Sequence, residues 1–248
     1  YPKSGNTWIR SLLSSYLFSK NGNFNFDLLK YIARFSVDYL PTQIGNKINQ
    51  QERIAKNWIP TQKLLNKDKK LHFLKTHNAL CAINGNKFTD KFNTKAIIYI
   101  VRDPRNLVLS LSHHFELNYS EALNFITNKK KIIFPLDEKN TNKKKPNYND
   151  FNYLGDWASH YNSWKNNNFC PFKIIKYEDL LLDTRSIFLS ILNFISKFTE
   201  VKLDENKINK SIETTNFDNL MKMEEEGDFY ESSISTKTKK KIKFFNLG

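Results

Sequence analysis

The first eight residues, YPKSGNTW, combine a lysine, hydroxyl groups and a glycine in the pattern of an anion-binding loop. Gly5 lets backbone N–H groups approach an oxyanion closely, and a helical pattern begins near Thr7, so the positive end of a helix would face the same anion. Ser4, Asn6 and Thr7 add side-chain hydrogen-bonding groups, and Lys3 adds a positive charge. The segment therefore predicts a site for a phosphate group.

The order of residues in this loop differs from that of the loops that bind nucleoside triphosphates. In the Walker pattern the lysine follows the last glycine, whereas Lys3 precedes Gly5. A P-loop kinase would also need an acidic residue for Mg²⁺, and none is evident at the expected place. A kinase of similar fold remains one alternative function, which these two departures disfavour.

Cations also follow three other segments that have the pattern of β-strands. Lys75 and His77 stand in LKTH, Arg102 opens RDPR, and Lys176 precedes Tyr177 in KYED. Because ligands of an open α/β sheet bind at the carboxyl ends of its strands, we expect these side chains to form one anion pocket. His77 is the candidate general base, since an imidazole titrates near neutral pH.

Four short apolar segments predict the strands that position these residues, and a helical pattern follows most of them at short range. Nearly continuous apolar runs are typical of parallel strands buried on both faces, and alternating strands and helices predict βα units. The expected fold is a single α/β domain with a central parallel sheet flanked by helices. The predicted strands are Tyr1–Pro2, Leu71–Leu74, Ala96–Val101 and Phe172–Ile175, and the predicted helices are Thr7–Phe18, Leu107–Leu117, Leu154–Asn166 and Ser186–Phe198.

The composition is that of a globular domain with a strong positive charge. A length of 248 residues fits one large domain, and 40% hydrophobic residues suffice for a core. The net charge of +14 raises a basic nucleic-acid-binding module as a second alternative. However, Lys, Asn and Ile are all over-used, and the lysine clusters stand in polar stretches, where a solvated face explains them. We therefore expect no nucleic-acid partner.

Cysteine usage and hydropathy bear on the compartment. Cys81 and Cys170 form neither a disulfide framework nor a metal-site pattern, which favours the cytoplasm. No run approaches the roughly 18 apolar residues of a membrane span. The chain lacks an initiator methionine and begins with what resembles the end of a strand, so we interpret its N-terminal end as truncated, with an upstream signal or anchor still open.

One long stretch has no interpretable pattern. Asn128–Asn152 is rich in Lys, Asn and Pro and lacks periodicity. Because it is too long for an ordinary connection, we expect either a lid over a site or a disordered loop.

The motifs, taken in order, resemble sulfotransferases of the cytosolic type, which use 3′-phosphoadenosine 5′-phosphosulfate (PAPS). YPKSGNTW is similar to the family's 5′-phosphosulfate loop, usually YPKSGTTW, with Asn6 as the mismatch. RDPRNLVLSLSHH is similar to the 3′-phosphate motif, with Arg102 and Ser110 in register, and LKTH resembles the segment that carries the catalytic histidine. GDWASHYNSW, KYEDL and TTNF match further segments, and the last of these, with Thr215 and Phe217, resembles a T-x-F element that contacts the nucleotide.

This resemblance implies a sulfotransferase fold related to that of P-loop NTPases, and transfer of a sulfonate group from PAPS to a hydroxyl or amine. The product nucleotide would be 3′-phosphoadenosine 5′-phosphate (PAP), and no metal would be required. The acceptor would be a small molecule, a carbohydrate or a lipid, and the oligomeric state stays open. The implied catalytic residues are His77, Lys3 and Lys75, and the implied nucleotide-binding residues are Lys3, Ser4, Gly5, Asn6, Thr7, Trp8, Arg102, Ser110, Tyr177, Thr215, Phe217 and Gly248.

One segment departs from the family pattern. The family's F-x-R-K-G element supplies Arg and Lys to the 3′-phosphate, whereas this chain has FFNLG, with Asn246 and Leu247 at those positions. The charge for that phosphate is therefore expected from Arg102, from Lys239–Lys243 or from residues beyond Gly248. The departure also motivates a third alternative, an inactive relative that binds the nucleotide without turnover.

Overall fold

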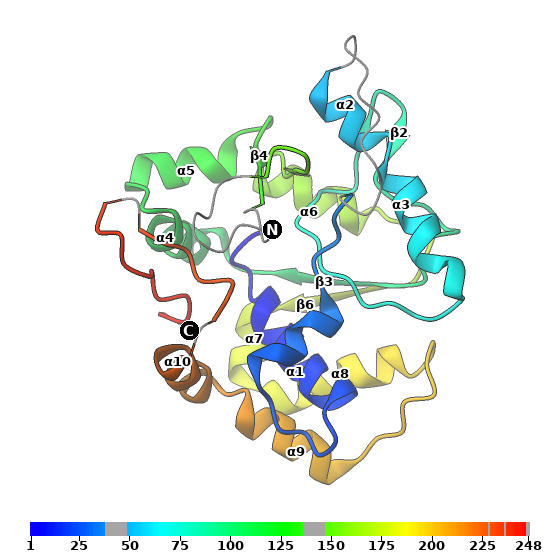
Figure 1. Ribbon diagram of the computed structural model, residues 1–248, viewed down its shortest axis with the longest axis vertical. Helices are drawn as coiled ribbons and strands as arrows, with labels where there is room; N and C mark the ends of the chain where they lie inside the picture. The colour runs from blue at the N-terminus through cyan, green and yellow to red at the C-terminus, as the bar shows by residue number, and fades with distance from the viewer. Residues whose placement is uncertain (38–48, 136–146, 228, 236, 247–248) are drawn as a thin grey trace. The chain divides into compact units, whose positions relative to one another are not determined.

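The computed structural model describes residues 1–37, 49–135, 147–227, 229–235 and 237–246 (Figure 1). The chain forms two compact units, each assembled from separate stretches of sequence. Unit 1 comprises Tyr1, Arg34–Tyr99 and Asn124–Phe172. Unit 2 comprises Pro2–Ala33, Ile100–Leu123 and Lys173–Gly248.

Two of the predicted strands are present and paired. β3 (Ile97–Val101) and β6 (Phe172–Lys176) are hydrogen-bonded neighbours. Each is followed by a helix within a few residues, β3 by α4 (Pro104–Phe115) and β6 by α7 (Tyr177–Leu182). These strand–helix pairs agree with the predicted α/β class.

The predictions of a strand at Leu71–Leu74 and of a strand end at Tyr1–Pro2 were wrong. The leucines at both ends of the first segment are 42% and 41% exposed, so LHFL is not the doubly buried run that a parallel strand needs. Instead, Lys75 alone forms a parallel bridge with Arg34, and its carbonyl accepts the N–H of Phe35 at 2.8 Å. At the other segment, proline has no N–H to donate to a sheet ladder.

All four predicted helices are present, with shifted ends. The caps explain the shifts, because the side chains of Asp103, Asp156 and Asp183 each accept an N–H from the first turn of the helix that follows. Pro104 also favours an early start of its helix, since proline suits the first helical position. The observed helices are α1 (Asn6–Phe18), α4, α6 (Trp157–Lys165) and α8 (Thr184–Ile195).

Unit 2 is built around α1, which carries the predicted anion-binding loop at its N-terminus. α1 packs against the 3₁₀-helix η1 (Phe26–Ile32) and against α9 (Glu205–Thr214), and α8 packs against α7 and α9 (Figure 1). Every residue from Thr7 to Tyr16 is buried. The loop therefore leads into one of the most buried elements of the unit. The last helix described in unit 2 is α10 (Phe217–Glu226).

Unit 1 has short antiparallel pairs and an aromatic core. β1 (Ala82–Ile83) pairs with β2 (Asn86–Lys87), and β4 (Ile132–Ile133) pairs with β5 (Asn152–Tyr153). The buried rings of Trp58 and Phe88 lie 5.3 Å apart, edge to face, and Phe35, Phe151 and Trp164 adjoin them. The remaining helices of this part of the chain are α2 (Gln50–Ala55), α3 (Trp58–Leu65), η2 (Asn66–Asp68) and α5 (Tyr119–Thr127), whose first half belongs to unit 2.

The stretch expected to be a lid or disordered loop lies partly outside the described residues, from 136 to 146. Its described ends contain β4 and the first residue of β5. Over the described ranges, no helix combines the length and apolar character needed to cross a membrane.

A buried ion pair connects α1 to the C-terminal part of unit 2. Nη1 of Arg10 lies 2.6 Å from Oε1 of Glu231, and the arginine side chain is 4% exposed. Its other nitrogens donate to the carbonyl oxygens of Leu29 and Ile32. Glu231 also accepts the hydroxyl of Thr7 at 3.4 Å, in the first turn of α1. This network fixes the end of α1 that follows the predicted anion-binding loop.

Replacing Glu231 by Gln should lower the free energy of unfolding by about 3 kcal/mol, because the buried Arg10 charge loses its counter-ion. Urea denaturation measures the change. The matched control is Glu213→Gln, which breaks the exposed pair between Lys210 and Glu213 and should change the same free energy by less than about 1 kcal/mol. Equal, small effects of both substitutions would show that the Arg10 pair does not stabilise α1.

Candidate functional site

The backbone of the loop turns sharply before α1. Lys3 and Gly5 both have positive φ angles, 64° and 100°, in the left-handed region. Gly5 is the N-cap of α1, and among the described residues no side chain caps the helix and no acidic residue stands in its first turn. The N–H groups at this helix end are therefore available to an external anion.

The ring of Tyr177 lies against Gly5. A Cβ atom on this glycine would stand 2.4 Å from Cδ2 of the tyrosine, closer than any real contact. Tyr177 begins α7, directly after β6, and is 5% exposed. Its burial raises the pKa of the hydroxyl, so the group stays protonated and can donate a hydrogen bond at neutral pH. Glycine is thus required here both by its φ angle and by the space that the ring leaves.

Arg102 connects the loop to the end of β3. Its Nη1 donates to the carbonyl oxygen of Lys3 at 3.3 Å, and its Cζ lies 4.2 Å from the centre of the Tyr177 ring. The residue is 8% exposed, and its Nε has no hydrogen-bond partner within the described part of the chain. A buried guanidinium with an unpaired N–H is costly in a protein without ligand. Such a group is suited to bind an anion.

Two loop side chains also carry buried polar atoms without partners. They are Oγ of Ser4, whose residue is 1% exposed, and Oδ1 of Asn6. These two atoms and Nε of Arg102 all lie in or beside the predicted loop. They are three of the eight buried side-chain polar atoms that have no hydrogen-bond partner in the described ranges. The other five belong to Arg53, Trp58, Thr61, Ser112 and Ser211.

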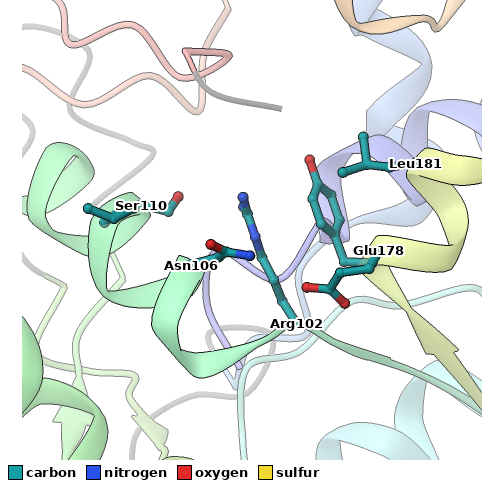
Figure 2. A pocket seen from close by; sticks show the side chains of 7 residues that line it. Arg102, Asn106, Ser110, Glu178 and Leu181 are labelled. Carbon is teal, nitrogen blue, oxygen red and sulfur yellow. The ribbon is translucent and has the colours of Figure 1, made fainter.

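A cavity of about 170 Å³ opens beside Arg102 in unit 2 (Figure 2). Figure 2 shows Asn106 and Ser110, from α4, on one side of Arg102, and Glu178 and Leu181, from α7, on the other. Oε1 of Glu178 accepts the N–H of the residue after Arg102 at 2.9 Å, which braces the end of β3. The remaining lining residues are Leu109 and Tyr177.

Four of these lining residues were not among the predicted site residues. They are Asn106, Leu109, Glu178 and Leu181. The helical period could have identified two of them, because Asn106 stands four positions before Ser110 and Leu181 stands four positions after Tyr177. Glu178 stands in KYED, at the end of a predicted strand, whereas Leu109 has no comparable signal in the sequence.

Trp8 and Thr215 lie behind the loop and support it. Nε1 of Trp8 donates to the carbonyl oxygen of Thr215 at 2.9 Å, and its ring meets that of Tyr177 at 6.1 Å. Trp8 is 8% exposed, and the hydroxyl of Thr215 donates to the carbonyl oxygen of Ser211. Phe217, the first residue of α10, has its ring 6.2 Å from that of Phe245.

The FFNLG segment reaches the loop through Phe244. Nζ of Lys3 lies 3.6 Å from the centre of the Phe244 ring, a cation–π contact. The backbone N–H groups of Phe244 and Phe245 donate to the two carboxylate oxygens of Glu224, at 2.7 and 2.9 Å. The segment is therefore held by one carboxylate. The predicted site residue Gly248 and the neighbouring Leu247 lie outside the described residues.

Lys243, one of the cations expected near the 3′-phosphate, forms an ion pair with Glu225 at 2.6 Å, and both side chains are largely exposed. It does not line the cavity. Arg102 is the cation that lines it within the described part of the chain.

Lys75 and His77 are brought together in unit 1. Nζ of Lys75 lies 3.4 Å from Nε2 of His77. Because an ammonium group only donates, Nε2 of His77 is the acceptor in this contact. The loop, Arg102, Ser110 and Tyr177 belong to unit 2. The predicted site residues therefore form two groups, one in each unit.

Within the described ranges of the chain, no group of three or more His, Cys, Asp or Glu side chains is arranged to hold a metal ion.

Comparisons with known proteins match this chain to sulfotransferases. Luciferin sulfotransferase from Photinus pyralis is 24% identical over 240 residues, which are 89% of this chain and 55% of that protein. This chain thus spans about half the length of that relative. The structure of mouse sulfotransferase SULT7A1 complexed with PAP superposes on the whole chain and on 69% of its own, with a TM-score of 0.54 and 15% identity. At that identity the likeness concerns the fold.

A family model for the sulfotransferase domain matches residues 1–246, which is nearly the entire chain. The match includes the loop, Arg102, the cavity-lining segments of α4 and α7, and the segment with Lys75 and His77. The chain therefore belongs to the sulfotransferase domain family.

Proposed function

We propose that the protein transfers a sulfonate group from PAPS to a hydroxyl or amine of a small-molecule acceptor and releases PAP. The observation that carries the proposal is the set of buried polar atoms without partners, on Ser4, Asn6 and Arg102, beside the uncapped start of α1. A buried, unsatisfied polar group is costly unless a ligand completes it. The relatives support the choice of ligand, since one is a luciferin sulfotransferase and another is complexed with PAP.

The residues around the loop fit the two ends of such a nucleotide. The N–H groups at the start of α1 and the hydroxyl of Ser4 would bind the 5′-phosphate group. Arg102, with Asn106 and Ser110 across the cavity, would bind the 3′-phosphate. In this proposal Arg102 supplies the charge that the family's Arg-Lys pair would add, because Asn246 is uncharged and Lys243 pairs with Glu225.

The chemistry needs charge stabilisation and one proton acceptor. As the acceptor oxygen bonds to sulfur, the bond between sulfur and the 5′-phosphate oxygen breaks and that oxygen gains negative charge. Lys3 would stabilise this leaving oxygen, and Lys75 would stabilise the sulfonate oxygens. When Lys75 turns from Nε2 of His77 to the sulfonate oxygens, the lone pair of Nε2 is released, and His77 would take the proton of the acceptor hydroxyl there. In this proposal the transfer uses no metal ion.

A second candidate function is nucleotide binding without turnover. Asn246 favours it, because an uncharged side chain stands where the family has an arginine. The two candidates share the nucleotide site and differ only in transfer.

PAP should raise the melting temperature of the protein, and ATP with Mg²⁺ should not. At about 100 times its Kd, a ligand that binds only the folded state adds about 2.7 kcal/mol of stability. Thermal-shift measurements test this. Arg102→Ala should remove most of the PAP effect, whereas Arg105→Ala, which removes a neighbouring exposed arginine, should keep it. Stabilisation by ATP and not by PAP would refute the proposal.

Lys3→Ala and His77→Gln should each lower transfer of ³⁵S-sulfonate from PAPS by about 10²- to 10³-fold, because each removes one stabilising or proton-accepting group. A panel of phenols, alcohols and amines serves as acceptors, and EDTA should have no effect. Circular dichroism checks that both variants stay folded. If His77→Gln retained most of the rate, His77 would not be the base. If the unaltered protein bound PAP but transferred to no acceptor, the second candidate would hold.

Gly5→Ala should weaken PAP binding about tenfold, as when one hydrogen bond is lost, because the new Cβ would displace the Tyr177 ring. Isothermal titration measures the affinity. Gly85→Ala is the matched control, since Gly85 also has a positive φ of 79° but nothing within 4 Å of its added Cβ. Gly85→Ala should lower the free energy of unfolding by about 1 kcal/mol and leave the PAP affinity unchanged. Equal PAP affinities of the two variants would contradict a role of the close Gly5–Tyr177 contact.

A further inference from the structure

We propose that His160 is a positioning residue for His77, and that it acts by holding the backbone carbonyl of His77. This proposal rests on the proposed function, because it takes His77 as the base of the transfer reaction. All of the groups involved belong to unit 1.

The His77 backbone is held by side chains on both of its polar groups. Its N–H donates to Oδ1 of Asn152 at 3.2 Å, and its carbonyl oxygen accepts from Nε2 of His160 at 3.1 Å. The partners stand 75 and 83 positions away in the sequence. Because no sheet ladder is described at His77, these two side chains set the orientation of its peptide and thus the direction of its imidazole.

The hydrogen bonds also fix the protonation of His160. A carbonyl oxygen only accepts, so Nε2 of His160 must carry a proton. The hydroxyl of Tyr99 lies 2.9 Å from Nδ1 and donates to it. His160 is 2% exposed, and burial lowers its pKa well below the usual value, so the ring is neutral. With both nitrogens engaged, His160 is not itself available as a base.

The same face of α6 holds the residues that follow His77. Oγ of Ser163 accepts the N–H of Leu80 at 3.0 Å, and Nε1 of Trp164 donates to the carbonyl oxygen of Asn78 at 2.9 Å. Ser163 and Trp164 stand three and four positions after His160, so the three side chains share one helix face. α6 therefore presents a row of hydrogen-bonding groups to the segment with the proposed base.

Three substitutions of His160 separate positioning from simple packing. The amide nitrogen of Gln reaches the place of Nε2 and can still donate to the His77 carbonyl, whereas Asn is too short and Phe has no donor. If His160 only fills space, the loss of activity in each of the three variants should follow its loss of folding stability. If His160 positions His77, the Gln variant should keep the activity that the Asn and Phe variants lose.

In the transfer assay, His160→Asn and His160→Phe should lower kcat about 10- to 100-fold, the size of effect that a misplaced catalytic group produces. PAP affinity should stay within about twofold. His160→Gln should retain kcat within about threefold. The matched control is His72→Phe, which removes an exposed histidine that bonds Asp68 and should leave kcat unchanged. Equal kcat losses in the Gln and Phe variants would overturn the proposal.

A readout that needs no acceptor distinguishes this proposal from the proposed function. In protein labelled with ¹³C-histidine, the ring signal of His77 is assigned by its loss in His77→Gln. The signal should move or broaden in the Asn and Phe variants and stay in place in the Gln variant. An unmoved signal in all three variants would overturn the positioning role, whatever the activity. If the Phe variant does not fold, the Asn variant decides. A moved signal in a protein that transfers to no acceptor would support positioning while the proposed function fails.

Discussion

The left-handed turn at Lys3 and Gly5 is the constraint on which the proposed nucleotide site depends. The Tyr177 ring leaves no room for a Cβ on Gly5, and Arg102 contacts both the ring and the carbonyl of Lys3. One backbone turn therefore brings the end of β3, the end of β6 and the start of α1 into contact. An anion at this turn would meet a helix end and a guanidinium together, which strengthens both interactions where water is excluded.

The turn leaves polar atoms unsatisfied, and the rest of unit 2 offsets that cost. Ser4 and Arg102 are buried with unpaired atoms, each unfavourable by about 1–3 kcal/mol. The fully buried stretch of α1 and the ion pair between Arg10 and Glu231 hold the loop in place despite this cost. Stability gained behind the loop thus permits a site in which donors are oriented before a ligand arrives, which is how preorganised electrostatic sites work.

The sequence predicted the parts of the fold whose signals are local. β3 follows from an apolar run, and α1 follows from helical periodicity. The backbone conformation at His77 could not be predicted in this way, because its N–H and carbonyl bond to the side chains of Asn152 and His160, residues far along the chain. Likewise, Asn246 marked a departure from the family pattern, but no local signal indicated that Phe244 contacts Lys3.

The distribution of charge argues for a small anion as ligand more strongly than the total charge argues for nucleic acid. Nucleic-acid affinity arises from many exposed cations that neutralise successive phosphates. Here Arg102, the cation that lines the described cavity, is 8% exposed and stacks on Tyr177. Exposed lysines such as Lys210 and Lys243 pair instead with neighbouring carboxylates. The described cavity has a volume of about 170 Å³, and Arg102 is the cation among its lining residues. The net charge of +14 therefore reflects exposed residues of the surface, whereas Arg102 is the cation that lines the described cavity.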